Sequence, residues 1–188
     1  MRAEKTALEG VVIIEPDVFT DERGFFVETF QEKRYQEALG NDVHFVQDNL
    51  SVSKKGVLRG LHYQAPPYGQ AKLAQVLRGR ALDVVVDIRN GSPTFGKHVV
   101  VELSGENHRQ LFIPVGFAHG FLALEEETIF AYKCTQLYSK EHERGILWND
   151  PEIGINWGVT DPIMAEKDKN FPLLTNTSRD YFFEKLKS

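Results

Sequence analysis

A histidine and an arginine interrupt the strand-like segment formed by residues 57–64. An imidazole suits proton transfer because its unperturbed pKa lies near neutrality. Arg59 and His62 are three positions apart, so a regular strand would direct them to opposite faces. Gly60 lies between them and is a candidate β-bulge, which would bring both side chains to one side. The segment leaves two roles open for His62, a catalytic base and a hydrogen-bonded structural residue.

A second histidine follows a turn in the pattern Pro114-x-Gly116-x-x-His119. This pattern resembles the second motif of cupins, a superfamily of small β-barrels whose metal-binding members add an upstream H-x-H pair and a glutamate. Here the matching stretch holds His62 alone, and Lys72 lies near the place expected for an acidic ligand. A lysine would repel a divalent ion, and too few ligands remain for a usual transition-metal site. We therefore expect no metal.

A third segment, residues 129–134, places Tyr132 on one strand face with Phe130 and Cys134. A buried tyrosine usually packs its ring and hydrogen-bonds its hydroxyl, so a structural role stays open beside a role as an acid. The acid role requires Tyr132 to face His62 across the barrel. Cys134 is the only cysteine, which excludes an intramolecular disulfide, and its flanks predict a buried thiol.

The elements that must position these side chains are mostly short strands. Apolar runs bounded by Gly, Asn, Asp and Pro recur along the chain, a pattern typical of all-β sandwiches and barrels. The expected strands cover residues 25–29, 45–52, 57–63, 72–78, 82–88, 97–103, 110–113, 120–124 and 129–136. Helices are expected at residues 31–39, 161–169 and 178–186. The fold class is therefore all-β, with small helical additions.

Composition limits the kinds of protein that this chain can be. Its 188 residues, 41% of them apolar, suit one domain spanning 1–188. A net charge of -5 argues against a nucleic-acid partner, which normally requires a basic face. The apolar run at residues 11–14 is too short for a signal peptide or a membrane span. We therefore expect a cytoplasmic protein without a membrane partner.

Five motifs occur in order along the chain. They are Asp21-Glu22-Arg23-Gly24-Phe25-Phe26, Phe45-Val46-Gln47-Asp48-Asn49, Leu58-Arg59-Gly60-Leu61-His62, Ile113-Pro114-x-Gly116-Phe117-Ala118-His119-Gly120 and Ile146-Leu147-Trp148-Asn149-Asp150. Together they resemble the dTDP-4-dehydrorhamnose 3,5-epimerase family, metal-free cupins of the dTDP-L-rhamnose pathway, from about residue 12 to residue 168. The resemblance implies a cupin-type double-stranded β-helix, or jelly-roll, barrel with a few short helices.

The resemblance also implies a reaction. It inverts C3 and C5 of dTDP-4-dehydro-6-deoxy-D-glucose to give dTDP-4-dehydro-L-rhamnose. Each inversion removes a proton from one face of the sugar and returns one to the other, through an enolate. A base, an acid and a donor at the carbonyl oxygen are required. The C4 ketone already acidifies both neighbouring C–H bonds, so no cofactor is expected.

The roles of individual residues follow from the same resemblance. His62 is the base, and Asp168 orients it as the carboxylate does in a catalytic triad. Tyr132 is the acid on the opposite face of the sugar. Lys72 lies near the enolate oxygen, and His119 is a hydrogen-bonding ligand of the sugar or phosphate rather than a second base.

Further side chains are implied to bind the nucleotide-sugar substrate. They are Arg23, Arg59 and Lys167 at the diphosphate, Gln47 and Asn49 as neutral donors, Glu28 and Glu143 as acceptors, and Phe26 and Tyr138 as candidates to stack on thymine. Arginine suits phosphate because its planar fork makes two parallel hydrogen bonds. Family members form homodimers in which N-terminal strands cross to the partner, which would carry Arg23, Phe26 and Glu28 to the neighbouring site.

Several alternatives stay open. Relatives within the family invert one carbon only, and 3,4-ketoisomerases move the ketone instead; the joint presence of His62, Tyr132 and Asp168 favours epimerisation. A metal-dependent cupin, such as a dioxygenase, would lose activity with a chelator. A non-catalytic sugar-nucleotide binding module would keep its affinity after His62→Ala. The preference for dTDP over another nucleotide rests on the resemblance alone.

Overall fold

The computed structural model describes residues 1–40 and 42–183. Along this part of the chain the elements are β1 (Arg2–Lys5), β2 (Val12–Glu15), β3 (Val18–Asp21), β4 (Gly24–Val27), α1 (Glu32–Leu39), β5 (Gln47–Ser53), β6 (Leu58–Gln64), β7 (Lys72–Arg78), β8 (Arg80–Asp87), β9 (His98–Ser104), β10 (Gln110–Ile113), β11 (Phe117–Ala123), β12 (Thr128–Cys134), η1 (Lys140–His142), β13 (Glu143–Gly145), α2 (Glu166–Lys169) and η2 (Leu174–Asn176).

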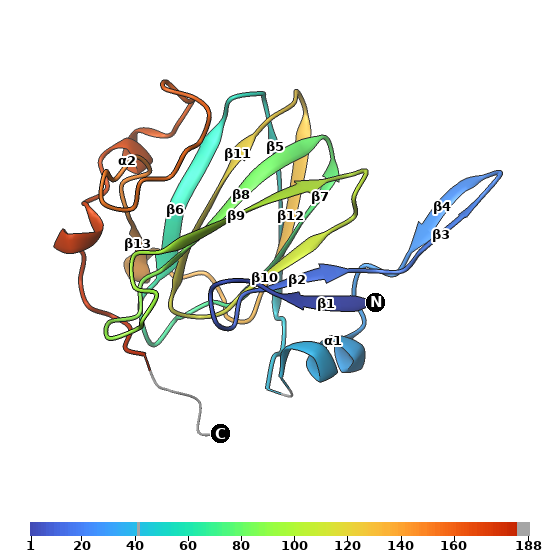
Figure 1. Cartoon of the computed structure of the whole chain (residues 1–188), viewed down its shortest axis with the longest axis horizontal. Coiled ribbons are helices and arrows are strands. Elements are labelled where there is room, and N and C mark those ends of the chain that lie inside the picture. The colour runs from blue at the N-terminus through green and yellow to red at the C-terminus, as the bar shows by residue number, and fades with distance from the viewer. Residues whose placement is uncertain (41, 184–188) are drawn as a thin grey trace.

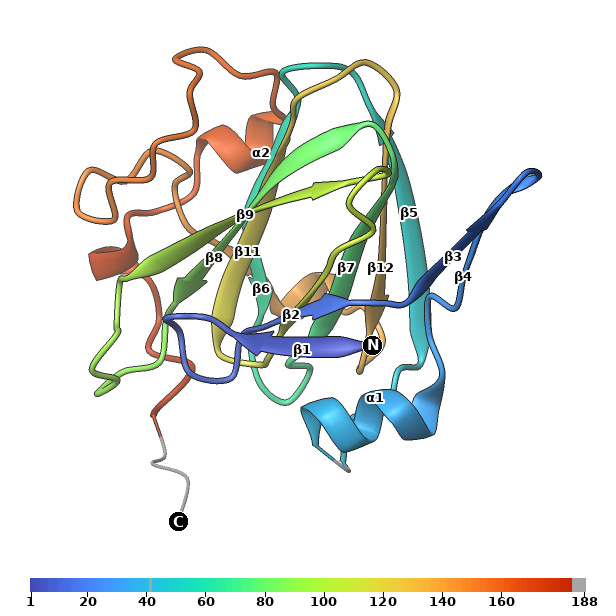
Figure 2. The ribbon, with the colours of Figure 1, turned by 45° about the vertical axis from the view of Figure 1, so that its right-hand side comes forward.

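Two antiparallel sheets face each other and form the barrel (Figures 1 and 2). In the described residues the first sheet has the strand order β1-β2-β10-β7-β12-β5, and the second has the order β13-β6-β11-β8-β9. Neighbours in each sheet are mostly distant in sequence, as the crossing connections of a jelly roll require. The all-β, cupin-like jelly-roll fold predicted from the sequence is confirmed.

The space between the sheets is filled by large apolar side chains. Phe130 from β12 is fully buried and stacks on Phe121 from β11, with ring centroids 3.9 Å apart. This stack joins the two sheets and also forms part of the wall of a cavity. Because both rings are fixed by packing, strands β11 and β12 hold their polar neighbours in fixed positions.

A second apolar cluster covers the outer face of the five-stranded sheet. Val84 and Val86 from β8 pack there with Ile146 and Trp157 from the C-terminal part of the chain. Strand β8 is therefore buried on both faces, because Val85 points into the other cluster. This packing brings the C-terminal segment, including α2, alongside β6 (Figure 1).

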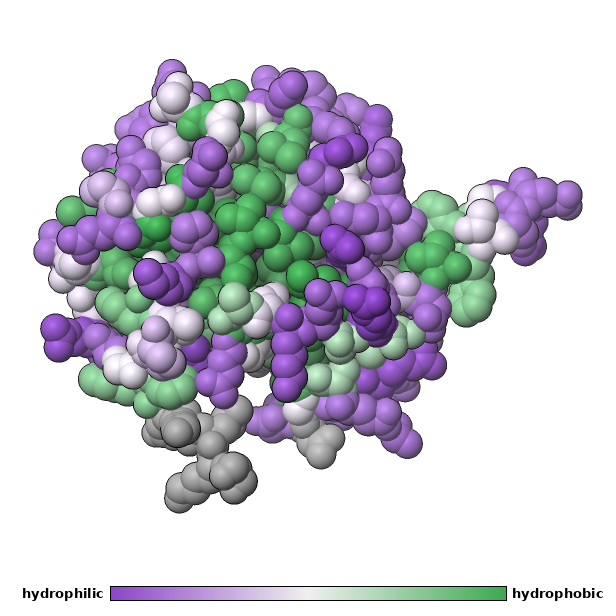
Figure 3. All heavy atoms as spheres, in the orientation of Figure 1, coloured by the Kyte–Doolittle hydropathy of each residue, from purple (hydrophilic) through white to green (hydrophobic). Residues whose placement is uncertain are grey.

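Strands β3 and β4 form a hairpin that projects from the barrel (Figures 1 and 3). Hydrophobic residues lie along its base and hydrophilic ones at its tip. Phe19, Phe25 and Phe26 are each more than half exposed. Such a concentration of exposed aromatic rings is typical of a surface that another molecule covers.

The predicted strands are confirmed with shifts of up to three residues at their ends, whereas β1, β2, β3 and β13 had not been predicted. The helix expected at residues 31–39 is present as α1. The helix expected at 161–169 is confined to Glu166–Lys169, because Ile163 pairs with Val57 as a β-bridge.

The helix expected at residues 178–186 is wrong over residues 178–183, which contain no helix and in which Phe182 forms a β-bridge with Asn90. Residues 184–186 lie outside the described residues. Of the helices that the structure describes, none combines the length and the apolar character needed to cross a membrane.

Candidate active site

A bulge in β6 brings Arg59 and His62 to the same cavity. On the partner strand β11, His119 pairs with His62 and Phe121 pairs with Arg59, so β6 contains one extra residue between these pairs. Gly60 adopts a φ of +132°, and a Cβ there would lie 2.5 Å from the Gly120 Cα. Only glycine combines that conformation with so close an approach of two backbones. The predicted bulge is confirmed.

His62 forms a hydrogen-bonded pair with Asp168 from α2. The His62 Nε2 atom lies 2.9 Å from the Asp168 Oδ1 atom, and the Gly60 N–H donates to Oδ2 at 3.4 Å. Burial alone would raise the pKa of Asp168, but its contacts with His62, Gly60 and Lys167 outweigh burial and lower this pKa. The carboxylate therefore stays ionised and holds the ring through Nε2, which leaves Nδ1 available as a proton acceptor.

Tyr132 and Lys72 occupy the opposite sheet. The Lys72 Nζ atom lies 5.8 Å from the centroid of the Tyr132 ring. Burial raises the pKa of the Tyr132 phenol above 10.0, so this group keeps its proton at neutral pH. Burial lowers the pKa of the Lys72 ammonium, and the negative charges of Asp83 and Glu143 act against that shift.

These four side chains surround a cavity of about 620 Å³ between the two sheets. Its lining includes Asn49 from β5, Arg59 and His62 from β6, Lys72 from β7, His119 from β11, Tyr132 from β12, Glu143 from β13, and Lys167 and Asp168 from α2. A base on one wall and a protonated phenol on the other are suited to proton transfer on two faces of one ligand. Within the described residues, no group of three or more His, Cys, Asp or Glu side chains could hold a metal ion.

The cationic side chains of Lys167 and Arg59 both line this cavity. Lys167 donates to Glu143 at 2.6 Å, and the Tyr138 hydroxyl donates to the same carboxylate at 3.2 Å. Burial would raise the pKa of Glu143, but the contact with Lys167 outweighs it, so this pKa is lowered. The Arg59 Nε–H donates to the Ser53 hydroxyl, which leaves its other N–H groups for a ligand. Together these charges fit an anionic group such as a diphosphate.

The sequence model of the family described as dTDP-4-dehydrorhamnose 3,5-epimerase matches residues 5–176. The chain belongs to this family. It is 55% identical to the dTDP-4-dehydrorhamnose 3,5-epimerase of Shigella flexneri over 97% of this chain and 99% of that one. It is 56% identical to the Methanothermobacter thermautotrophicus enzyme of the same name over 92% of this chain and 94% of that one.

A solved structure of an epimerase from Legionella pneumophila, in complex with dTDP-4-keto-L-rhamnose, has the same fold. It superimposes with a TM-score of 0.94 at 49% identity, and the match covers 98% of this chain and 99% of that one. The chain is therefore an enzyme of the isomerase class. The family resemblance seen in the five sequence motifs is confirmed.

Gln47 and Tyr138, two binding residues expected from the epimerase family, lie beside the cavity. The Gln47 side chain donates to the Asn49 Oδ1 atom at 3.1 Å and accepts from the Tyr138 N–H at 3.0 Å. Tyr138 in turn contacts Glu143, which lines the cavity. The two residues are therefore connected to the site by hydrogen bonds.

Arg23, Phe26 and Glu28 are not brought to the epimerase cavity of their own chain. Arg23 lies at the tip of the β3–β4 hairpin and pairs with Asp21. Phe26 and Glu28 line a different cavity of about 590 Å³ near α1, where Glu28 pairs with Arg34. In this respect the three residues differ from the other expected binding residues.

Two polar residues near the cavity were not predicted as site residues. Asp83 on β8 is fully buried and contacts the His119 Nε2 atom. Ser51 on β5 lines the cavity, and its hydroxyl has no hydrogen-bond partner in the described part of the chain. The sequence did carry a signal for each of them. Asp83 is a carboxylate inside the apolar strand at residues 82–88, and Ser51 lies on the strand face that carries Gln47 and Asn49.

Proposed function

We propose that this chain inverts C3 and C5 of dTDP-4-dehydro-6-deoxy-D-glucose to give dTDP-4-dehydro-L-rhamnose. The observation that carries the proposal is the His62–Asp168 pair at a cavity whose opposite wall holds Tyr132 and Lys72. The L. pneumophila neighbour is named in complex with dTDP-4-keto-L-rhamnose, the product expected of this reaction.

In the proposed mechanism, His62 removes a proton from a carbon beside the ketone. The Asp168 carboxylate holds Nε2 and stabilises the imidazolium that forms. The bonding electrons of the C–H bond move into an enolate whose oxygen is the former C4 carbonyl. Lys72, which lines the same cavity, stabilises this oxygen with its positive charge.

Tyr132 returns a proton to the opposite face of the same carbon. The raised pKa of Tyr132 keeps its phenol protonated until the enolate has formed, and the enolate carbon then accepts the proton. The two groups come from opposite sheets, and this separation allows inversion rather than return of the proton to the original face. The ketone acidifies the C–H bonds at both C3 and C5, so the same pair can act on each carbon in turn. Between the two inversions His62 releases its proton to water and Tyr132 takes one from water, which restores the base and the acid.

The nucleotide part of the substrate is proposed to contact the cationic side chains that line the cavity. Arg59 and Lys167 are suited to the diphosphate, with Asn49, Gln47 and Glu143 as hydrogen-bonding neighbours. His119 is proposed to hydrogen-bond the sugar or phosphate, and Tyr138 to lie against the base.

The proposal includes a homodimer in which the β3–β4 hairpin of one copy reaches the cavity of the other. This arrangement accounts for the distance of Arg23, Phe26 and Glu28 from the cavity of their own chain. It also accounts for exposed apolar side chains on β5, at the end of the six-stranded sheet, where Leu50 and Val52 are more than half exposed. Both surfaces would be covered by the same contact.

The decisive experiment incubates chelator-treated protein with dTDP-4-keto-6-deoxy-D-glucose in D₂O and follows the sugar protons by NMR. We expect loss of both the C3 and C5 proton signals. His62→Ala should slow both exchanges by about 100- to 10,000-fold, as expected for loss of a general base.

Other outcomes would replace parts of this proposal. Exchange at C3 alone would make the protein a single-carbon epimerase with the same machinery. Activity that disappears with the chelator and returns with a divalent metal would indicate a metal-dependent cupin. Binding of the nucleotide sugar without any exchange would indicate a binding module.

A further inference from the structure

A carboxylate in the middle of the barrel has no role in the mechanism described above. Asp83 on β8 has a relative exposure of 0%, and one of its oxygens contacts the His119 Nε2 atom. Its second oxygen, Oδ2, has no hydrogen-bond partner among the described residues. Burying an ionised carboxylate is costly unless a cation or several donors compensate it. A buried polar atom without a partner therefore calls for a functional or structural explanation.

The arrangement around His119 repeats the arrangement around His62. The two histidines are direct partners in the register of β6 and β11, and both line the cavity. Asp168 reaches His62 from α2, beside β6, whereas Asp83 reaches His119 from β8, on the other side of β11. In each pair the carboxylate holds Nε2.

The Nδ1 atom is therefore the ring nitrogen left for a ligand in both histidines. No hydrogen bond to either Nδ1 atom is formed by the part of the chain that the structure describes. Asp83 also opposes the lowering of the Lys72 pKa by burial, so its charge acts on two side chains of the cavity wall. Both effects concern groups that face the bound sugar in the proposed reaction.

We propose that Asp83 is a positioning residue of the epimerase, which acts by holding His119 through Nε2 and directing Nδ1 to the bound sugar. The proposal rests on the function proposed above and extends it by one residue. It makes the cavity a site with two carboxylate-anchored imidazoles on adjacent strands. Asp83 does not touch the substrate, so its whole effect on turnover passes through the side chains that it holds.

The variant Asp83→Asn tests this role with little change in shape. An amide can offer an N–H to the His119 Nε2 atom, so the ring is no longer confined to one tautomer. In the ligand-free protein, ¹⁵N NMR should show Nε2 of His119 protonated in the unsubstituted chain and a changed pattern in Asp83→Asn. We expect kcat/KM to fall by about 10- to 100-fold, the range for loss of a charge-assisted hydrogen bond.

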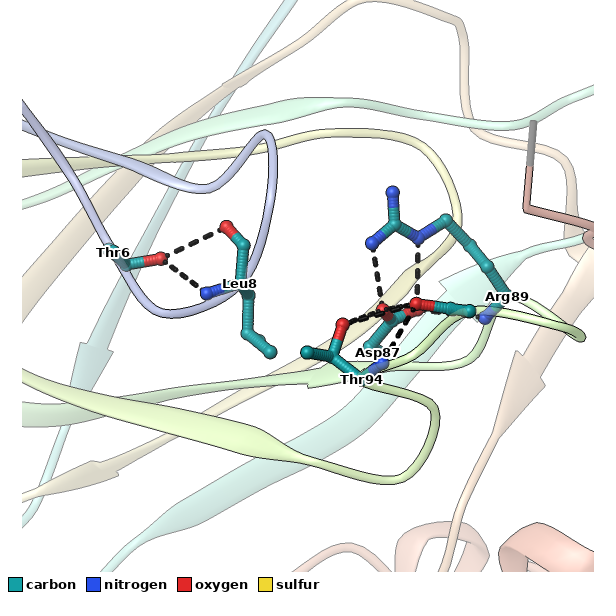
Figure 4. Close-up of polar contacts among 6 residues, drawn as sticks. Thr6, Leu8, Asp87, Arg89 and Thr94 are labelled. Atoms are coloured by element: carbon teal, nitrogen blue, oxygen red, sulfur yellow. Dashed lines mark hydrogen bonds and ion pairs between the residues drawn. The ribbon is translucent and has the colours of Figure 1, made fainter. Parts of the chain in front are cut away.

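The matched control is Asp87→Asn. Asp87 lies on the same strand and is equally buried, but it bonds to Arg89 and Thr94 (Figure 4) and to Ser92. None of these residues lines the cavity. This variant should lose thermal stability while the His119 ring signals and kcat/KM stay near those of the unsubstituted chain. A structural effect of removing a buried carboxylate is thereby separated from an effect on the site.

A double variant tests whether Asp83 acts through His119. If it does, the loss of kcat/KM in Asp83→Asn combined with His119→Gln should be clearly smaller than the sum of the two single losses, with only the effect of the Asp83 charge on Lys72 remaining. Fully additive losses, unchanged His119 signals in Asp83→Asn, or equal losses of kcat/KM in the Asp83 and Asp87 variants would each overturn the proposal. If the unsubstituted chain exchanges neither sugar proton, the proposed function fails, while the ring signals still report whether Asp83 sets the His119 tautomer.

Discussion

His62 and His119 are neighbours across two strands, yet each takes its carboxylate from a different element. This difference matters because a histidine alone can donate or accept at either nitrogen. The carboxylate decides which nitrogen is left for the ligand. The chemistry of the cavity is thus determined by pairs of residues rather than by single side chains.

The pH dependence of turnover should identify the group whose deprotonation reduces kcat/KM at alkaline pH. Burial lowers the pKa of Lys72 below 10.5 and raises that of Tyr132 above 10.0. Because Lys72 acts as a cation in the proposed mechanism, kcat/KM should fall as the pH rises through its lowered pKa. Lys72→Arg should remove this alkaline decline, because guanidinium stays protonated, while lowering kcat at neutral pH.

The measurement is the pH profile of kcat/KM for both proteins, with the melting temperature followed at each pH. An alkaline decline that is the same in Lys72→Arg would assign it to another group. A shift to higher pH in the variant would support the ammonium of Lys72 as the cation at the enolate oxygen.

At the scale of the elements, the bulge in β6 is the feature that assembles the site. In a regular strand Arg59 and His62, three positions apart, would lie on opposite faces. Gly60 makes the bulge feasible, since its Cα lies against the backbone of β11. The strand therefore presents the base and a candidate phosphate ligand to one cavity.

Gly60→Ala should disrupt both the fold and the site. A Cβ would lie 2.5 Å from the Gly120 Cα and 2.9 Å from the His119 carbonyl oxygen. We expect a loss of about 3 kcal/mol or more in the free energy of unfolding, measured by urea denaturation. Gly91→Ala is the control, because Gly91 also has a positive φ, of +80°, but has open space around its Cα.

Gly91→Ala should lower the free energy of unfolding by about 1 kcal/mol, which is the cost of a left-handed conformation for alanine. Equal losses in the two variants would mean that backbone conformation, and not the close approach of β6 and β11, determines the requirement for glycine at position 60.

For the whole molecule, the projecting hairpin is the feature that one chain does not explain. Its aromatic rings are exposed, and it holds the expected binding residues Arg23 and Phe26 away from the cavity. Strand β5 presents exposed apolar side chains of its own. The proposed homodimer would bury both surfaces and complete the site.

Phe26→Asp should weaken this dimer and raise the KM for the nucleotide sugar. Placing a charge among exposed apolar rings should raise the dimer dissociation constant by at least about tenfold, as for loss of an interface hot spot. Sedimentation across a range of protein concentrations would measure it. Val100→Asp is a matched control, since Val100 is an exposed apolar residue on β9, away from the hairpin. An unsubstituted chain that sediments as a monomer, or a KM that does not change in Phe26→Asp, would contradict the dimer.

Local patterns in the sequence were sufficient to predict the main strands, the bulge in β6 and the family of this protein. Alternating apolar residues predicted the main strands, and Gly60 between two polar residues predicted the bulge. The order of five motifs was sufficient to recognise the epimerase family. These features depend on residues that are close together in the chain, so their spacing is visible without a fold.

Tertiary structure decided how the polar groups are paired. Asp168 meets His62 across 106 positions of sequence, and Asp83 meets His119 across 36. No local pattern in the sequence connects Asp168 with His62, and Asp83 is one acidic residue in an apolar strand. The helix expected at residues 178–183 was also overruled, because Phe182 bridges Asn90. Such pairings depend on strand register and on the packing of distant segments, which no local pattern records.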